Sequence, residues 1–177
     1  MYRSQRLLPW ILLTGTLCLL LVMRRHGALL SSFSESPAGI VSLELAQTKE
    51  RTDAIIQAWA SHSSHNVLQH AVQNTQIDFV FLVFYSLLLF VLCYNCSFQQ
   101  SGTQQIISQL LSIGALKAGM LDVAENLLLL HSLKGHSTNL VAGITWLLAS
   151  VKFALVTVVI LWLMVCYALQ VFKTLRS

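Results

Sequence analysis

The chain has 177 residues, of which 55% are hydrophobic and only 10% are charged. Soluble domains carry about 25% charged residues, so much of this protein's surface must face something other than water. The net charge of +4 comes mainly from basic residues beside apolar runs, which is typical of membrane helices, and no basic patch interleaved with aromatic residues indicates a nucleic-acid partner.

The first apolar run covers residues 7–23 and has two arginines on either side, Arg3 and Arg6 before it and Arg24 and Arg25 after it. About 17 residues is close to the minimum for a helix that crosses a bilayer. A secretory signal peptide is the alternative, but no small-residue cleavage site follows the run. We therefore interpret it as an uncleaved anchor helix.

A long polar connection, residues 31–75, leads to the second span. Within it, Ile55 and Trp59 share one face of a helical wheel, while Glu50 and Asp53 lie on the opposite face, and this pattern predicts an amphipathic helix. The connection is too long for a structureless loop. We expect two or three short helices that cap the bundle or lie on the bilayer surface.

Three further apolar runs predict membrane-spanning helices over residues 77–94, 106–130 and 140–172. The last run would form a helix of about 50 Å, which must tilt or extend beyond the hydrocarbon core. The expected fold is an all-α membrane protein with four transmembrane helices, arranged as a single domain over residues 1–177, with a short amphipathic helical cap between the first two spans.

Four spans place both termini on the same side of the membrane. Basic residues are nearly balanced between the two sides, so their number alone does not decide the orientation. Both termini are basic without any acid, and a long connection with charges of both signs crosses a membrane more easily than its basic count suggests. We therefore expect both termini in the cytoplasm.

The third span carries polar residues that a lipid-facing helix would not tolerate, because a charge at mid-membrane costs at least about 2.5–3.5 kcal/mol. They are Lys117, Asp122, Glu125 and Asn126. Small and polar residues also recur there at helical spacing, as in closely packed membrane helices. This seam consists of Ser108, Ser112, Ala115, Gly119, Asp122 and Asn126.

Lys152 on the fourth span lies within reach of these acids when the two helices run antiparallel, and we pair it with Asp122 or Glu125. On the second span, Asp78 lies at the outer end and Tyr85 lies two turns deeper on the same face. We expect these residues and Asn126 to form one buried polar cluster.

Two interpretations of this cluster stay open. It either fixes the register of the helices as a satisfied ionic network, or lines a site for a proton, an ion or a small ligand, as intramembrane ionisable groups usually do. Lys117 belongs to the same set of intramembrane polar residues, but it lies about 140° around the helix from Asp122. We expect it outside the core pair, reaching a separate partner or water.

Cys93 and Cys96 form a C-x-x-C pair at the end of the second span, and Cys166 lies near the same membrane edge. A thiol oxidoreductase would need a second cysteine pair on the long connection, which contains no cysteine, and a structural metal site usually needs four ligands. We favour a chance placement of these cysteines. The histidines of the connection have no neighbouring acid or cysteine and are expected to be solvated: His62, His65 and His70.

No phosphate-binding glycine loop, serine nucleophile motif or H-E-x-x-H pattern occurs in the chain. We expect no catalytic residue, no metal and no cofactor. The leading interpretation is a non-enzymatic integral membrane protein, either an accessory subunit with a membrane-protein partner or a small bundle that is stand-alone or homo-oligomeric. The alternatives are a transporter or proton-linked ligand-binding protein that uses the cluster, and a membrane thiol oxidoreductase that uses Cys93 and Cys96.

Three strings in the chain carry a resemblance: GIVSLELAQT over residues 39–48, DFVFLVFYSLLL over 78–89 and ALKAGMLDVAEN over 115–126. They resemble a group of small bacterial four-helix integral membrane proteins, in which an A-G-x-L-D-x-x-E-N stretch lies in a late span and a lysine follows in the last one. The resemblance covers residues 38–153. It implies the same architecture and a place in the bacterial cytoplasmic membrane, but no activity.

Overall fold

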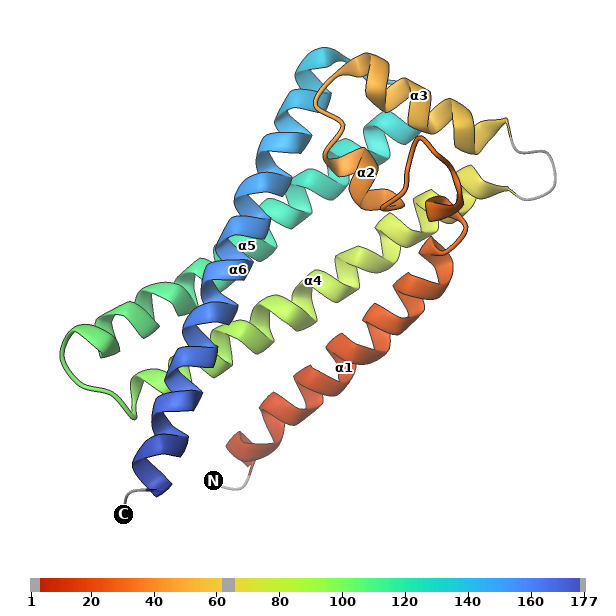
Figure 1. The fold of residues 1–177 in the computed structure, drawn as a ribbon. Coiled ribbons are helices and arrows are strands. Elements are labelled where there is room, and N and C mark those ends of the chain that lie inside the picture. The colour runs from red at the N-terminus through yellow and green to blue at the C-terminus, as the bar shows by residue number, and fades with distance from the viewer. Residues whose placement is uncertain (1–3, 62–65, 176–177) are drawn as a thin grey trace.

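The computed structural model describes residues 4–61 and 66–175, and the regular structure in this part of the chain is helical throughout. Four of the described helices are long and apolar enough to cross a membrane, which confirms the predicted all-α membrane fold (Figure 1). They are α1 (Ser4–Gly27), α4 (Val67–Ser97), α5 (Thr103–Leu133) and α6 (Asn139–Leu175).

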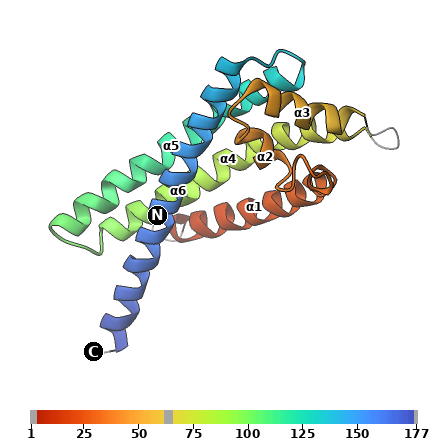
Figure 2. The same cartoon turned by 45° about the horizontal axis from the view of Figure 1, so that its top comes forward.

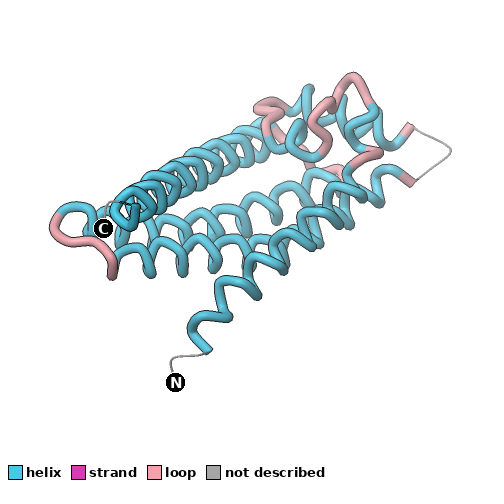
Figure 3. Tube along the Cα trace, turned by 60° about the horizontal axis from the view of Figure 1, so that its bottom comes forward, coloured by secondary structure: helices cyan, strands magenta, loops and turns pink. Residues whose placement is uncertain are grey.

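The long helices form one bundle. α4 and α5 form an antiparallel pair, α6 packs mainly on α5, and α1 packs on α4 (Figures 1 and 2). The non-helical segments gather at the two ends of the bundle (Figure 3). The start of α1 and the end of α6 lie at the end of the bundle opposite the short helices (Figure 1), as expected for a chain that crosses a membrane four times.

Gly119 allows the close approach of α4 and α5. A Cβ atom on this residue would lie 2.8 Å from the Cβ of Ser86 on α4, closer than two carbon atoms can pack without a shift of the backbone. The seam predicted along α5 therefore faces its neighbouring helices. Its six members are all buried: Ser108, Ser112, Ala115, Gly119, Asp122 and Asn126.

The cap consists of three short helices across one end of the bundle: η1 (Leu30–Ser32), α2 (Ile40–Glu44) and α3 (Lys49–Ala60). Thr48 caps α3 by accepting a hydrogen bond from the backbone N–H of Arg51 at 3.3 Å. The amphipathic pattern of α3 is confirmed, because Ile55 and Trp59 are buried while Glu50 is exposed.

Two polar contacts hold the cap against the turn between α5 and α6. The backbone N–H of Lys49 donates to Oδ1 of Asn139 at 2.8 Å, and Ser137 donates to the carboxylate of Asp53. α2 lies below α3, nearer the middle of the bundle (Figure 1). The cap thus places one short helix close to the intramembrane residues.

α4 is longer than the apolar run that predicted it, because it begins at Val67 and the run begins at Ile77. Residues 67–76, a mixture of apolar and polar side chains, continue the helix, and Ala71, Asn74 and Thr75 are buried there. Asn74 donates to the carbonyl oxygen of Met23 at the end of α1, at 3.0 Å. Contacts with α1 and the cap thus extend the helix beyond its apolar part.

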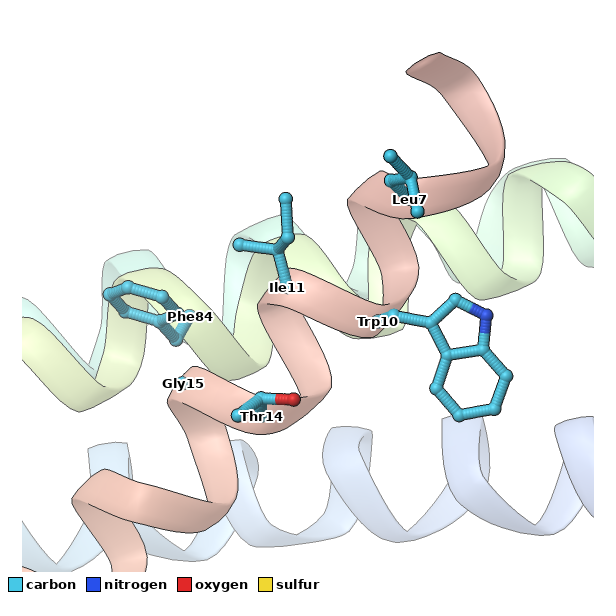
Figure 4. Close-up of a pocket in the computed structure, with 6 residues that line it drawn as sticks. All are labelled: Leu7, Trp10, Ile11, Thr14, Gly15 and Phe84. Atoms are coloured by element: carbon cyan, nitrogen blue, oxygen red, sulfur yellow. The ribbon is translucent and has the colours of Figure 1, made fainter. Parts of the chain in front are cut away.

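α1 is less buried than the other helices. An open apolar groove beside it faces the surroundings of the bundle (Figure 4). Gly15 brings α1 close to α4, since a Cβ atom there would collide with the ring of Phe84. The groove is lined by Leu7, Trp10, Ile11, Thr14, Gly15 and Phe84.

Candidate functional site

Lys152 of α6 lies at the centre of a buried ionic cluster. Its Nζ donates a hydrogen bond to Oδ1 of Asp122 at 2.9 Å and lies 2.8 Å from Oε2 of Glu125. A third carboxyl, that of Glu44, has its Oε2 3.6 Å from the same nitrogen. One ammonium group therefore meets three carboxyl groups, and all four side chains are buried.

Two further hydrogen bonds bring residues of α4 to this site. The Tyr85 hydroxyl donates to Oδ2 of Asp122 at 2.8 Å, and Nδ2 of Asn126 donates to Oδ2 of Asp78 at 2.6 Å. We define the polar cluster by these seven residues: Glu44, Asp78, Tyr85, Asp122, Glu125, Asn126 and Lys152.

The spacing along α5 explains its share of the cluster. Glu125 and Asn126 lie three and four residues after Asp122, so their side chains occupy neighbouring positions on one helical face. Gly119, one turn before Asp122, brings this face against α4. The carboxylate of Asp122 and the amide of Asn126 can therefore contact α4, while Glu125 contacts Lys152 of α6.

The sequence interpretation missed Glu44, which comes from α2 in the cap. It is 7% exposed. Its sequence context contained an indication, because it is a single acid among apolar neighbours in the stretch Leu43–Glu44–Leu45–Ala46. Helical periodicity cannot show which helix a five-residue segment will contact, so only the tertiary structure places Glu44 beside Lys152.

Lys117 is not part of the cluster, although it belonged to the predicted set of intramembrane polar residues. Its side chain is exposed on the outer face of α5. The reason is the angular separation of about 140° from Asp122, which turns Lys117 away when Asp122 faces α4 and α6.

Apolar layers lie on both sides of the polar cluster along the bundle. Towards the chain termini, the contacts between α4, α5 and α6 are filled by Leu89, Cys93, Ala115, Val159 and Leu163. Towards the cap, a second apolar core surrounds Trp59 of α3 and includes Leu43 of α2, next to Glu44. The ionisable groups are thus enclosed between two apolar cores.

The geometry indicates which carboxyl is ionised. Asp122 accepts hydrogen bonds from Tyr85 and Lys152, as suits a carboxylate. Among the described residues, Lys152 is the cation nearest the two glutamates, with its Nζ 2.8 Å from Oε2 of Glu125 and 3.6 Å from Oε2 of Glu44. The two glutamates lie beside the same ammonium group, and because carboxylates only accept hydrogen bonds, one of them could donate to the other only as the protonated acid.

Glu44 belongs to the cap and lies outside the membrane-spanning helices. Burial raises the pKa of Glu44, and the nearby Lys152 only partly opposes the shift. Burial thus shifts Glu44 towards its neutral form in the folded protein. Glu125, the other glutamate beside Lys152, is completely buried.

The cysteines form a different arrangement from the C-x-x-C pair. Cys93, Cys96 and Cys166 are free and buried, and Gln100 donates to Sγ of Cys96 at 3.6 Å. Gln100 donates to Sγ of Cys166 at 2.9 Å. Among residues 4–61 and 66–175, no group of three or more histidine, cysteine, aspartate or glutamate residues is arranged to hold a metal ion.

The predicted solvation of the connection's histidines is wrong for His70. It is half-buried on α4, and its ring centroid lies 6.0 Å from that of His26 at the end of α1. The extension of α4 beyond its apolar run places His70 against α1. His62 and His65 lie outside the described residues.

The chain matches no protein-family model, no curated protein and no solved structure.

Proposed function

We propose that this chain is a non-enzymatic integral membrane protein whose polar cluster binds and releases protons. The observation that supports the proposal is the excess of carboxyl groups over ammonium groups around Lys152. Its one ammonium group contacts the carboxyl groups of Glu44, Asp122 and Glu125. This is the proton-linked function weighed above as an alternative, and the excess of carboxyl groups favours it over a purely structural network.

The energetic argument rests on burial. An unpaired buried charge typically costs about 3–5 kcal/mol when its partner is missing, and a buried carboxyl avoids this cost by taking up a proton. If all three carboxyls were ionised, Lys152 would leave two negative charges uncompensated. Lys152 and Asp122 form the fixed ion pair of the cluster, and Glu44 and Glu125 hold the exchangeable protons.

Asp78 adds a fourth carboxyl close to the others. Asn126 donates to it, but an amide carries no charge and does not neutralise it. Taking up a proton requires no cavity, because the side chains of the cluster already contact one another. The cluster thus suits the proton better than a larger ligand.

Infrared spectroscopy tests the proposal. In lipid nanodiscs at neutral pH, the protein should show a carboxylic-acid C=O stretch, which an exposed glutamate would have lost, and the band should disappear at alkaline pH. Glu125→Gln and Glu44→Gln should each reduce the band. The matched control is Glu50→Gln on the exposed face of α3, which should leave it unchanged. A spectrum without this band in the wild-type protein would contradict the proposal.

The same proton links stability to pH. A carboxyl that keeps its proton in the folded state but loses it in the unfolded chain makes the folded state bind more protons, so the free energy of unfolding falls as pH rises. The decline begins near the ordinary range of glutamate and ends above the raised pKa of Glu44. Unfolding measured across this range should decline less steeply in Glu44→Gln.

We also propose a location in the bacterial cytoplasmic membrane with both termini in the cytoplasm. The resemblance of the third span to small bacterial membrane proteins and the basic termini support it. Single cysteines introduced by Lys134→Cys and His136→Cys, at exposed positions of the turn after α5, should react with a membrane-impermeant maleimide from the periplasm, and Ser4→Cys should not. Labelling of Ser4 and Lys134 from the same side would contradict the four-span topology, and complete reversal would contradict only the orientation.

A further inference from the structure

Lys117 lies near the middle of α5, one of the four helices long and apolar enough to cross a membrane. It is fourteen residues from the start of α5 at Thr103 and sixteen from its end at Leu133, or about 21 Å and 24 Å along the helix. Gly119, two residues further on, packs against Ser86, in the middle of the apolar run of α4. The position of Lys117 along α5 and the contact of its neighbour Gly119 with the middle of α4 thus indicate the same depth, near the centre of the bilayer.

The ammonium group of Lys117 has no ionic partner in the described chain. Its side chain is exposed, and residues 4–61 and 66–175 provide it with no ion pair. The hydrocarbon core is about 30 Å thick, so a lysine at its middle must cross about half of that to reach the headgroups. The four-carbon side chain is too short, and the unpaired charge in lipid carries a large cost.

A second copy of the chain offers no matching acid. The sequence contains seven acidic residues. Glu35, Glu44, Glu50 and Asp53 belong to the connection between α1 and α4. The acids of the spans are Asp78, Asp122 and Glu125, which face the polar cluster. A carboxylate that pairs with Lys117 within the bilayer would therefore come from another protein.

The surface around Lys117 suits a helix. Gly114, one turn before it, has no atom within 4 Å of the position that a Cβ atom would occupy, so a neighbouring backbone can approach closely there, as in small-residue contacts between membrane helices. Residues at alternating spacings of four and three form a stripe with Lys117 at its centre. This outer stripe consists of Leu110, Gly114, Lys117, Leu121 and Ala124.

We propose that the outer stripe of α5 binds a membrane-spanning helix of a different protein, and that an aspartate or glutamate of that helix pairs with Lys117. The polar cluster faces the inside of the bundle, so the partner contacts a separate surface. The protein is then one subunit of a membrane complex.

A synthetic transmembrane peptide tests the proposal directly. The probe is a leucine-rich helix with one glutamate at its centre, and the control peptide has leucine at that position. Fluorescence energy transfer in bilayers measures the association of the peptide with the full chain, which is labelled at Cys18. Cys18 is exposed, whereas Cys93, Cys96 and Cys166 are buried. The glutamate peptide should bind the wild-type protein about tenfold more tightly than the leucine peptide.

Lys117→Leu should remove this preference, whereas Lys134→Leu, in the turn after α5, should leave it intact. Lys117→Leu replaces a lipid-facing charge by an apolar group, so the variant should unfold no more readily than the wild-type protein. Equal binding of the two peptides to the wild-type protein would overturn the proposal. Association between copies of the chain that Lys117→Leu abolishes would assign the stripe to a second copy and overturn it as well.

Discussion

Lys152→Met should reduce the free energy of unfolding by about 3–5 kcal/mol, because it leaves the carboxyl groups around it without their cation. Lys152 is 6% exposed, so little water can solvate the charges that remain. Unfolding in nanodiscs or mixed micelles measures the change. The loss should be smaller at acidic pH, where protonated carboxyls need no cation.

The double variant Lys152→Met with Asp122→Asn separates the ion pair from the loss of packing. It should recover part of the stability lost in Lys152→Met, because the partner in direct hydrogen bond with Lys152 is then neutral. Lys117→Met is the matched control, since it removes a lysine from the exposed face of α5 and should cost little. If the effects of the two single changes simply add in the double variant, the pair does not interact.

Trp59→Ala should cost about 3–5 kcal/mol of cap stability, as is usual for a buried tryptophan. The side chain is 1% exposed, and its Nε1 donates to Oγ of Ser36 at 2.9 Å and to the carbonyl oxygen of Leu30 at 3.3 Å. The substitution thus opens a cavity and removes the donor that joins α3 to the start of the cap.

Hydrogen exchange should localise the effect of Trp59→Ala. Backbone amides of α2 and α3 should exchange faster, while those of α5 and α6 should change less. Trp10→Ala provides the matched control, because Trp10 is 67% exposed on α1. If the two variants unfold at the same denaturant concentration, the cap does not depend on Trp59.

The four long helices of the bundle could be predicted because a helix needs a long apolar run to cross the hydrocarbon core of a bilayer. The length of α4 was not predicted, since residues 67–76 mix apolar and polar side chains and are too polar to belong to a membrane-spanning run, and contacts such as that of Asn74 with Met23 hold this part of the helix. Local sequence contains no information on such a distant neighbour. The apolar run thus marked the part of the helix that suits lipid, and tertiary contacts set the rest.

The residues of the cluster also differ in whether their positions could be predicted from the sequence. Asp122 and Lys152 could be paired from the sequence, because antiparallel helices joined by a short turn bring residues at similar distances from that turn to similar depths. Glu44 could not be placed, because non-helical segments on both sides of α2 bring it to Lys152. Helical periodicity does not predict the course of such segments. The angular position of Lys117 followed from the helical repeat alone, but the open space at Gly114 needed the structure.

The position of Glu44 also has a consequence for how the chain is made. Glu44 precedes α4, and Lys152 lies on the last helix, so more than a hundred residues of synthesis separate the two partners. Asp122 and Glu125 emerge before their cation as well. Until α6 is made, these three acids lack Lys152, and because a protonated carboxyl costs less in lipid than a charged one, we expect α5 to enter the bilayer with its acids protonated. The arrival of α6 then converts a set of neutral acids into an ion pair, and only afterwards can α2 settle into its final place.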